Sequence, residues 1–222
     1  MFFLGTPIRR PEGVIPALAE GERHWRKGYS AYELAHAWVG AGDIPAPVRS
    51  VLDRAPELAG ARLVEAFFEM ETPLRSRGRP SQTDLLALLD VADGYAVVGI
   101  EGKVEEPFGP LVADWRDGGE GKERRLAVLC ATLGLVPDDI GELRYQLLHR
   151  TAAAVYEAQR YGTRLAAMLV QSFSTQHSWL DEFREFAARI SAPVAGAGTI
   201  SDPVELEGVS IRLGWVADRP SD

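Results

Sequence analysis

The chain has 222 residues, of which 46% are hydrophobic and 25% are charged, the composition of an ordinary soluble globular protein. The formal net charge of −8 argues against a surface that binds nucleic acid simply by coating its phosphates. A single cysteine, Cys130, excludes an internal disulfide framework. The N-terminal run MFFL is too short for a signal-peptide core or a membrane span, so we expect a cytoplasmic protein.

Two helices are predicted near the start of the chain. The segment 30–39 has Ser30 and Glu33 at the spacing of a capping box and continues with the pattern of an amphipathic helix. The segment 46–60 favours a second short helix that Gly60 ends. We therefore expect residues 1–60 to form a helical N-terminal part of one domain that spans residues 1–222.

Three strands are predicted to follow. Segment 62–74 alternates between two faces, one with Val64, Ala66, Phe68 and Met70, the other with Glu65, Phe67, Glu69 and Glu71. A polar loop, 75–82, leads to the apolar segment 83–91, which we interpret as a strand, with a buried helical turn as the alternative. The Asp-Gly pair at 93–94 predicts a turn into a third strand, 95–104, which is rich in β-branched residues.

The second half of the chain alternates helices with strands. Helical periodicity covers 122–135 and 140–162, which are closed by Gly134 and Gly162, and an amphipathic helix is predicted over 178–190. A buried strand is predicted over 164–174 and an edge strand over 209–216. A chain that returns from a strand through helices to a further strand implies a mixed sheet with helices on both faces. We therefore predict a single three-layer α/β domain.

The third strand ends in two opposite charges. Residues i and i+2 of a strand point to the same face, so Glu101 and Lys103 share one face. If the second and third strands form a hairpin, Asp84 lies near the same end of the ladder. The chain has 21 Arg and only three Lys, and a lysine here suits a site that needs a compact charge. Two carboxylates and a lysine that converge would hold Mg²⁺ and activate a water molecule.

This ordering resembles the PD-(D/E)XK nuclease superfamily, whose restriction-endonuclease-like fold has an αβββαβ core, an acidic residue at the start of the second strand and E-x-K on the third. The stretch SQTDLLALLD…VVGIEGK supplies Asp84, Glu101 and Lys103, and Thr83 stands where the superfamily has a proline. From GYSAYELAHAW through RPSQTDL, EGKVEEPFG and LRYQLLHRTAAAV to LVQSFS, the chain also looks like an uncharacterised bacterial protein family, which brings no activity with it.

The resemblance to the superfamily implies hydrolysis of nucleic-acid phosphodiester bonds with Mg²⁺ or Mn²⁺ as the cofactor, and DNA is favoured over RNA as the partner. Asp84 and Glu101 would hold the metal, the Gly102 carbonyl would be a third ligand, and Lys103 would position the attacking water. Such nucleases are compatible with an acidic chain, because their carboxylates are neutralised only once the metal is bound. A membrane partner is not expected.

Polar residues on the predicted helix 140–162 are further candidates. Gln146 and Arg150 lie one turn apart, as do Tyr145 and His149, so two polar pairs project from an otherwise apolar helix. Some superfamily members place a glutamine on this helix, where it holds a catalytic carboxylate or a phosphate; Gln146 matches loosely, with Arg150 where some relatives carry a tyrosine. The alternative is that the polar side of this helix packs on the N-terminal helices.

The sequence allows more than one role for several of these charged residues. Glu69 is a candidate metal ligand, or only part of the solvated face of an edge strand. The loop arginines Arg75, Arg77 and Arg79 could contact phosphates near Asp84, or they could serve solubility alone. The candidates for binding substrate are Arg79 and Arg150. Glu105 and Glu106 are expected outside the site. D…E-x-K is a short pattern that also arises as an incidental ion pair, so the alternative function is a catalytically inactive member of the fold that binds protein or nucleic acid.

Overall fold

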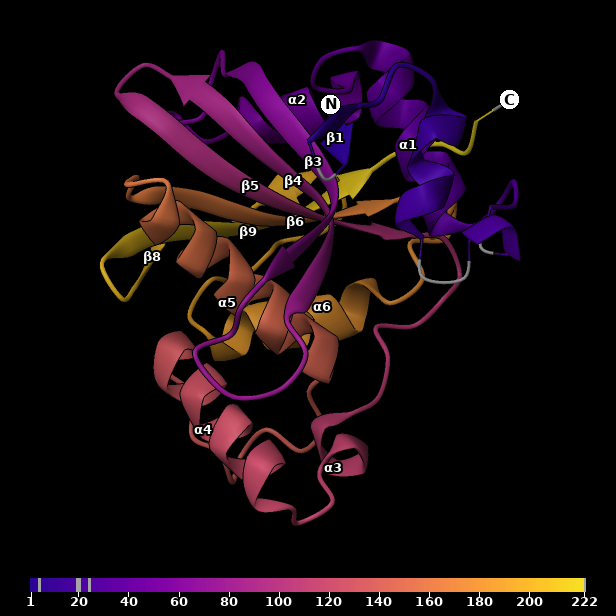
Figure 1. Cartoon of the computed structure of the whole chain (residues 1–222). Helices are drawn as coiled ribbons and strands as arrows, with labels where there is room; N and C mark the ends of the chain where they lie inside the picture. The colour runs from indigo at the N-terminus through magenta and orange to yellow at the C-terminus, as the bar shows by residue number, and fades with distance from the viewer. Residues whose placement is uncertain (4, 19–20, 24, 222) are drawn as a thin grey trace.

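The computed structural model describes residues 1–3, 5–18, 21–23 and 25–221. It shows a mixed sheet between two layers of helices (Figure 1). Along the sheet the strands follow the order β2-β1-β3-β4-β5-β6-β9-β7, and β8 also pairs with β9. The bounds are β1 Phe2–Phe3, β2 Thr6–Pro7, β3 Arg62–Thr72, β4 Ser81–Val91, β5 Gly94–Lys103, β6 Leu165–Ser172, β7 Thr199–Ile200, β8 Val204–Leu206 and β9 Val209–Ala217.

The helices cover both faces of this sheet, with α1 and α2 on one side and α5 and α6 on the other (Figure 1). Two 3₁₀ helices, η1 and η2, precede α1, and α3 and α4 lie between β5 and α5 along the chain. The bounds are η1 Pro11–Ala17, η2 Gly21–Arg23, α1 Ser30–Ala41, α2 Ala46–Leu52, α3 Val112–Trp115, α4 Glu120–Leu133, α5 Tyr145–Arg160 and α6 Leu180–Arg189.

Alternate side chains of the central strands pack into two hydrophobic cores, one on each side of the sheet. Leu85 and Val98 pack with α1 and α2 residues on one side of the sheet, and Leu86 and Val97 pack with α5 and α6 residues on the other. Both faces of β4 and β5 are thus buried, which explains why their sequences are apolar throughout. The predicted three-layer α/β arrangement, with a mixed sheet flanked by helices, is confirmed.

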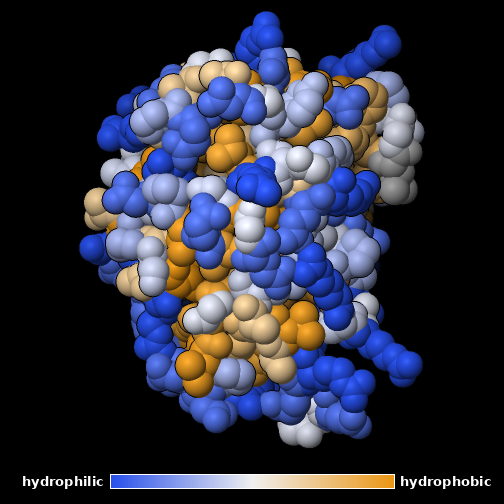
Figure 2. Space-filling view, turned by 90° about the vertical axis from the view of Figure 1, so that its left-hand side faces the viewer, coloured by the Kyte–Doolittle hydropathy of each residue, from blue (hydrophilic) through white to orange (hydrophobic). Residues whose placement is uncertain are grey.

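Most polar residues that do not belong to the two cores lie on the surface of the protein. The face shown in Figure 2 is largely hydrophilic, with hydrophobic residues visible between the polar ones from its upper part to its lower part. Within the described part of the chain, no helix is long and apolar enough to cross a membrane.

Helix α1 begins at Ser30, as predicted, but not through the predicted capping box. Tyr29 is the N-cap residue and makes no side-chain capping bond. Glu33 instead accepts hydrogen bonds from the N–H groups of Gly28, at 2.8 Å, and Ser221, at 2.6 Å. The position of the helix was right and its capping mechanism was wrong.

Two further expectations need correction. The strand predicted at an edge, β9, lies inside the sheet, with β6 on one side and the short strands β7 and β8 on the other. The helix predicted from residue 140 begins only at Tyr145, because the N–H of Tyr145 binds the carbonyl of Pro110 and Arg144 forms a bridge with Leu111. Residues 1–60 contain α1 and α2 as well as two short strands, of which β1 pairs with β3.

Candidate functional site

The site forms where two paired strands separate. β4 and β5 are paired from Val91 and Gly94 to Leu85 and Ile100, and the remaining residues of β5 pair with β6. Asp84 is the next residue of β4, and its Oδ2 accepts the N–H of Gly102 at 3.0 Å. A side-chain carboxylate therefore supplies the acceptor that the strand ladder no longer provides, and this contact fixes Asp84 beside the end of β5.

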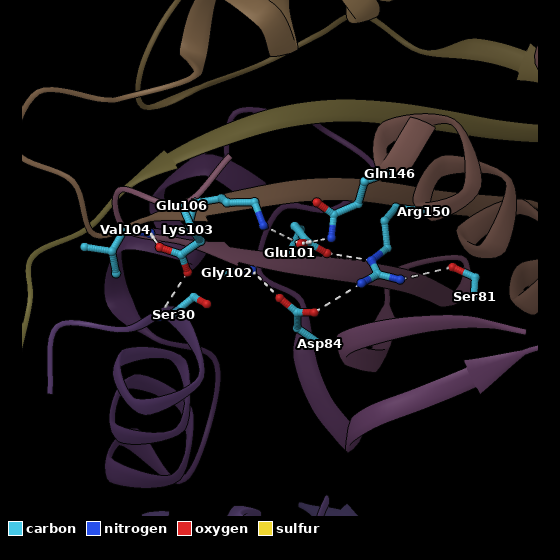
Figure 3. Close-up of polar contacts among 10 residues, drawn as sticks. All are labelled: Ser30, Ser81, Asp84, Glu101, Gly102, Lys103, Val104, Glu106, Gln146 and Arg150. Atoms are coloured by element: carbon cyan, nitrogen blue, oxygen red, sulfur yellow. Dashed lines mark hydrogen bonds and ion pairs between the residues drawn. The ribbon is translucent and has the colours of Figure 1, made fainter. Parts of the chain in front are cut away.

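Glu101 lies at the centre of the cluster (Figure 3). Its Oε1 accepts hydrogen bonds from Lys103 Nζ at 2.6 Å and from Gln146 Nε2 at 2.7 Å, and its Oε2 accepts from Arg150 Nε at 2.5 Å. The side chains of Glu101 and Lys103 are only 2% and 5% exposed. A buried carboxylate with two cationic partners stays ionised, and it orients the Lys103 ammonium.

Arg150 connects the two carboxylates of the motif. Besides its bond to Glu101, the guanidinium places Nη2 3.4 Å from Asp84 Oδ1, and its Nη1 donates to Ser81 Oγ at 3.3 Å (Figure 3). One planar cation thus spans the gap between Asp84 and Glu101. The two carboxylates come from different strands and converge closely enough to share a single positive group.

Glu69 lines the same pocket as these two carboxylates because the backbone of β3 is irregular at this residue. Its φ of +52° is in the left-handed region, and the neighbouring residues Phe68 and Met70 pack on opposite sides of the sheet. The predicted single face of β3 was wrong here and also at Val64, which is 46% exposed next to a bulge between Leu63 and Glu65. Strict alternation fails because these two irregularities rotate the side chains.

Burial raises the pKa of all three acidic groups, but neighbouring charges shift each of them differently. Burial and the charges of Asp84 and Glu101 raise the pKa of Glu69 to about 9. Burial and Glu101 raise the pKa of Asp84 to about 7, although Arg150 and Lys103 act against the rise. Burial also penalises ionised Glu101, but Arg150 and Lys103 outweigh it and hold its pKa at about 2. Three carboxyl groups share two cations, so the cluster retains a proton or needs further positive charge.

A pocket of about 390 Å³ opens onto these groups. The candidate residues Glu69, Asp84, Glu101, Lys103 and Gln146 all line it, together with Val14 of η1, Leu18 and residues at the start of α1. Arg150 lies against the two carboxylates, and Gly102 contributes its backbone N–H. Arg79 does not line this pocket; it lines a different one, on the side of α5 that carries Tyr145 and His149.

Glu106 was expected outside the site, and this was wrong. It lines the pocket, and its carboxylate accepts the N–H groups of Ser30, at 3.2 Å, and Val104, at 3.1 Å (Figure 3). The side chain thereby ties the start of α1 to the end of β5. Residue spacing could not indicate this, because Glu106 follows the strand in an irregular turn whose direction has no period.

The donor atoms at the pocket suit a hard divalent cation. Asp84 and Glu101 offer carboxylate oxygens, and the Gly102 carbonyl points to the same side of β5 as the N–H that binds Asp84. Gln146 Oε1 is buried and has no hydrogen-bond partner among the described residues. In that same part of the chain, no group of three or more His, Cys, Asp or Glu residues is arranged to hold a metal. Asp84 and Glu101 could supply one or two carboxylates to Mg²⁺, which keeps several waters, at the position that the Arg150 guanidinium bridges.

Comparison with known proteins identifies the family. The model of the domain of unknown function DUF6946 matches residues 7–220, so the chain belongs to that family. No curated protein and no solved structure matches the chain.

Proposed function

We propose that this member of the DUF6946 family is a nuclease that uses Mg²⁺ or Mn²⁺ to hydrolyse phosphodiester bonds of nucleic acid, with DNA favoured over RNA. The observation that carries the proposal is the convergence of Asp84, Glu101 and Lys103 in one pocket where β4 and β5 separate. The order of helix, three antiparallel strands, helix and strand in a three-layer domain supports the restriction-endonuclease-like fold as the finer description.

Each polar group of the pocket has a distinct part in such a reaction. Asp84, Glu101 and the Gly102 carbonyl would hold the metal, with Glu69 as a further carboxylate facing the same pocket. The metal, when bound, supplies Lewis acidity toward the phosphate and a water of lowered pKa. Lys103, oriented by Glu101, donates a hydrogen bond to the attacking water and offsets negative charge that develops on the phosphate. Gln146 holds the Glu101 carboxylate in place.

Hydrolysis itself needs only water as the second reactant. The water oxygen forms a bond to phosphorus, the bond from phosphorus to one ester oxygen breaks, and the leaving oxygen takes up a proton. The buried side of the pocket, formed by the sheet and α5, keeps Glu101 and Lys103 fixed while this exchange occurs.

The test is cleavage of labelled single- and double-stranded DNA and RNA with Mg²⁺ or Mn²⁺, comparing the natural chain with Asp84→Asn. This substitution keeps the shape of the side chain and removes one negative charge from an acid-rich cluster, so we expect it to fold. The cleavage rate should fall roughly 100-fold or more, because a metal ligand contributes several kcal/mol to transition-state stabilisation.

The matched control is Asp90→Asn, at the other end of the same strand, where Asp90 pairs with Arg62 on the surface. It should cleave at the rate of the natural chain. Absence of metal-dependent cleavage on every substrate, or equal rates in the two variants, would contradict the proposal.

One observation favours a second candidate function, an inactive member of the fold that binds nucleic acid or protein. The guanidinium of Arg150 already bridges Asp84 and Glu101, and it supplies internally the positive charge that a metal would bring. In that case the same substrates should be bound but not cleaved, and Asp84→Asn should leave binding unchanged.

A further inference from the structure

A second pocket, of about 550 Å³, lies at a face of α5 next to the face that contacts the carboxylate cluster. The loop between β3 and β4 forms one wall; in Figure 1 this loop extends away from the sheet alongside α5. The start of α4 and the residue Trp115 complete the lining. The residues that line it include four cations and three aromatic rings: Arg77, Arg79, Lys122, Arg125, Trp115, Tyr145 and His149.

The cations of this pocket are poorly compensated. Arg125 is only 8% exposed, its Nε donates to Tyr145 Oη at 2.6 Å, and no carboxylate among the described residues lies within ion-pair distance of it. Arg77 and Arg79 are exposed and, within the same part of the chain, also form no ion pair. Lys122 is partly neutralised by Asp117, at 2.9 Å. The Arg125 guanidinium borders the pocket without a counter-charge from the described part of the chain, so it can donate hydrogen bonds to an anion that enters there.

The shape of the site favours a compact anion with several acceptor oxygens. Guanidinium groups present rigid arrays of N–H donors that match phosphate oxygens. Gly121 and Lys122, in the first turn of the 14-residue helix α4, line the same pocket, and the Lys122 ammonium adds a fourth cation to it. The stacked rings of Trp115 and Tyr145, 3.9 Å apart, hold the Tyr145 hydroxyl against Arg125.

The two pockets are adjacent through α5. Gln146 and Arg150 on this helix contact Glu101, whereas Tyr145 and His149 line the basic pocket. Ser81 Oγ connects the two sides, because it lies 2.8 Å from His149 Nδ1 and 3.3 Å from Arg150 Nη1. A ligand that spans one edge of α5 would reach both pockets.

We propose that the basic pocket lined by Arg77, Arg79 and Arg125 binds a phosphate group of the nucleic-acid strand whose scissile bond lies at the carboxylate cluster. The phosphate chemistry follows from the pocket itself, and only the identification of its carrier as nucleic acid rests on the proposed function. The pocket would anchor the strand at one face of α5 while the reaction occurs at the neighbouring face.

The test measures binding of a short fluorescent oligodeoxynucleotide by anisotropy in EDTA, where no cleavage occurs, over a series of salt concentrations. The double variant Arg77→Ala/Arg79→Ala should lower the slope of log K against log salt by about one, since each lost phosphate contact removes roughly 0.7–0.9 of a unit. The matched control Arg54→Ala/Arg164→Ala removes two other exposed arginines and should keep the natural slope. Arg125→Gln should also weaken binding and lower the slope. If that variant does not fold, the double variant Arg77→Ala/Arg79→Ala still tests the proposal, because both residues are exposed.

Two forms of the probe identify the source of the phosphate. Tighter binding of the 5′-phosphorylated form, lost in Arg77→Ala/Arg79→Ala, would support a terminal phosphate, and equal loss for both forms would support a backbone phosphate. An unchanged slope and affinity in the double variant would overturn the proposal. Binding that depends on these arginines without any cleavage would overturn the nuclease proposal alone, and cleavage with binding that ignores them would overturn the phosphate pocket alone.

Discussion

At the level of single residues, the acidic groups of the pocket differ in the number of cations that contact them. Glu101 contacts both Lys103 and Arg150, whereas Asp84 shares only Arg150 at longer distance. Glu69 faces two other acids and is held in a left-handed backbone conformation. Titratable groups whose surroundings drive their pKa values apart are typical of functional sites.

Glu69 makes stability depend on pH in a direction that can be predicted. Its ordinary pKa is 4.5 and its folded pKa is about 9, so between these values the folded chain holds a proton that the unfolded chain has lost. Stability from this group is complete below about pH 4.5 and is lost as pH rises toward 9. Urea unfolding in EDTA across that range should show a steeper decline for the natural chain than for Glu69→Gln.

The control for this measurement is Glu65→Gln, an exposed position on the same strand. Its pH profile should follow that of the natural chain. Parallel profiles for the natural chain and Glu69→Gln would show that Glu69 is not protonated in the fold.

Part of the site could be predicted residue by residue. The spacing of Glu101 and Lys103 on a strand implies a shared face, and the hairpin between the strands brings Asp84 to the same end. The bridging position of Arg150 could not be predicted, because it depends on how a helix distant in the sequence is rotated on the sheet. Glu106 was misjudged because it lies in an irregular turn.

At the scale of elements, close packing of α5 on the sheet delivers Gln146 and Arg150 to Glu101. The helix is rich in alanine where it meets the sheet, with Ala152, Ala153 and Ala154 all buried. A Cβ added at Gly99 of β5 would lie 3.7 Å from the Ala154 Cβ, an ordinary van der Waals contact, so the helix packs closely on the strand here. The periodicity of α5 predicted its existence, but the β-bridge that delays its start to Tyr145 has no local signal.

Removing the Arg150 bridge should destabilise the protein strongly. In Arg150→Met, Asp84 and Glu101 lose a cation in a pocket where Glu101 is 2% exposed, and we expect a loss of about 3–5 kcal/mol in EDTA. Mn²⁺ should restore part of this, because a cation held by the two carboxylates of the folded state raises its stability. Thermal and urea unfolding with and without Mn²⁺ measure both effects.

Arg124→Met is the matched control, since Arg124 forms an exposed ion pair with Glu120 on α4. Its cost should not exceed about 1 kcal/mol, with no response to Mn²⁺. A loss in Arg150→Met no larger than in this control would show that the bridge does not hold the site together.

At the scale of the whole molecule, the order of elements was enough to predict a mixed sheet covered by helices on both sides. The strands β1, β2, β7 and β8 were not predicted, because two or three residues are too few to show a period. The N-terminal part was predicted only as a helical region, yet η1 and α1 provide one wall of the pocket. Such contacts depend on tertiary packing and leave no pattern in the sequence.

Charge is also distributed unevenly over the molecule. The net charge of −8 coexists with one pocket that gathers carboxylates and another that gathers arginines. The net charge alone therefore does not describe the surface, because an anion that approaches the arginine-lined pocket would meet a local excess of positive charge.

Catalysis by the site of Asp84, Glu101 and Lys103 is tested most directly by the metal-dependent cleavage rate of Lys103→Met. This substitution keeps much of the side-chain volume, and unfolding curves confirm that the variant folds. The rate should fall at least about 100-fold, because a positioned group acting on the water contributes about 10²–10⁴-fold. Lys27→Met, at an exposed lysine, should retain full activity, and Lys103→Arg should recover it only in part. Cleavage by Lys103→Met at the rate of Lys27→Met would contradict the assignment of Asp84, Glu101 and Lys103 as the catalytic site.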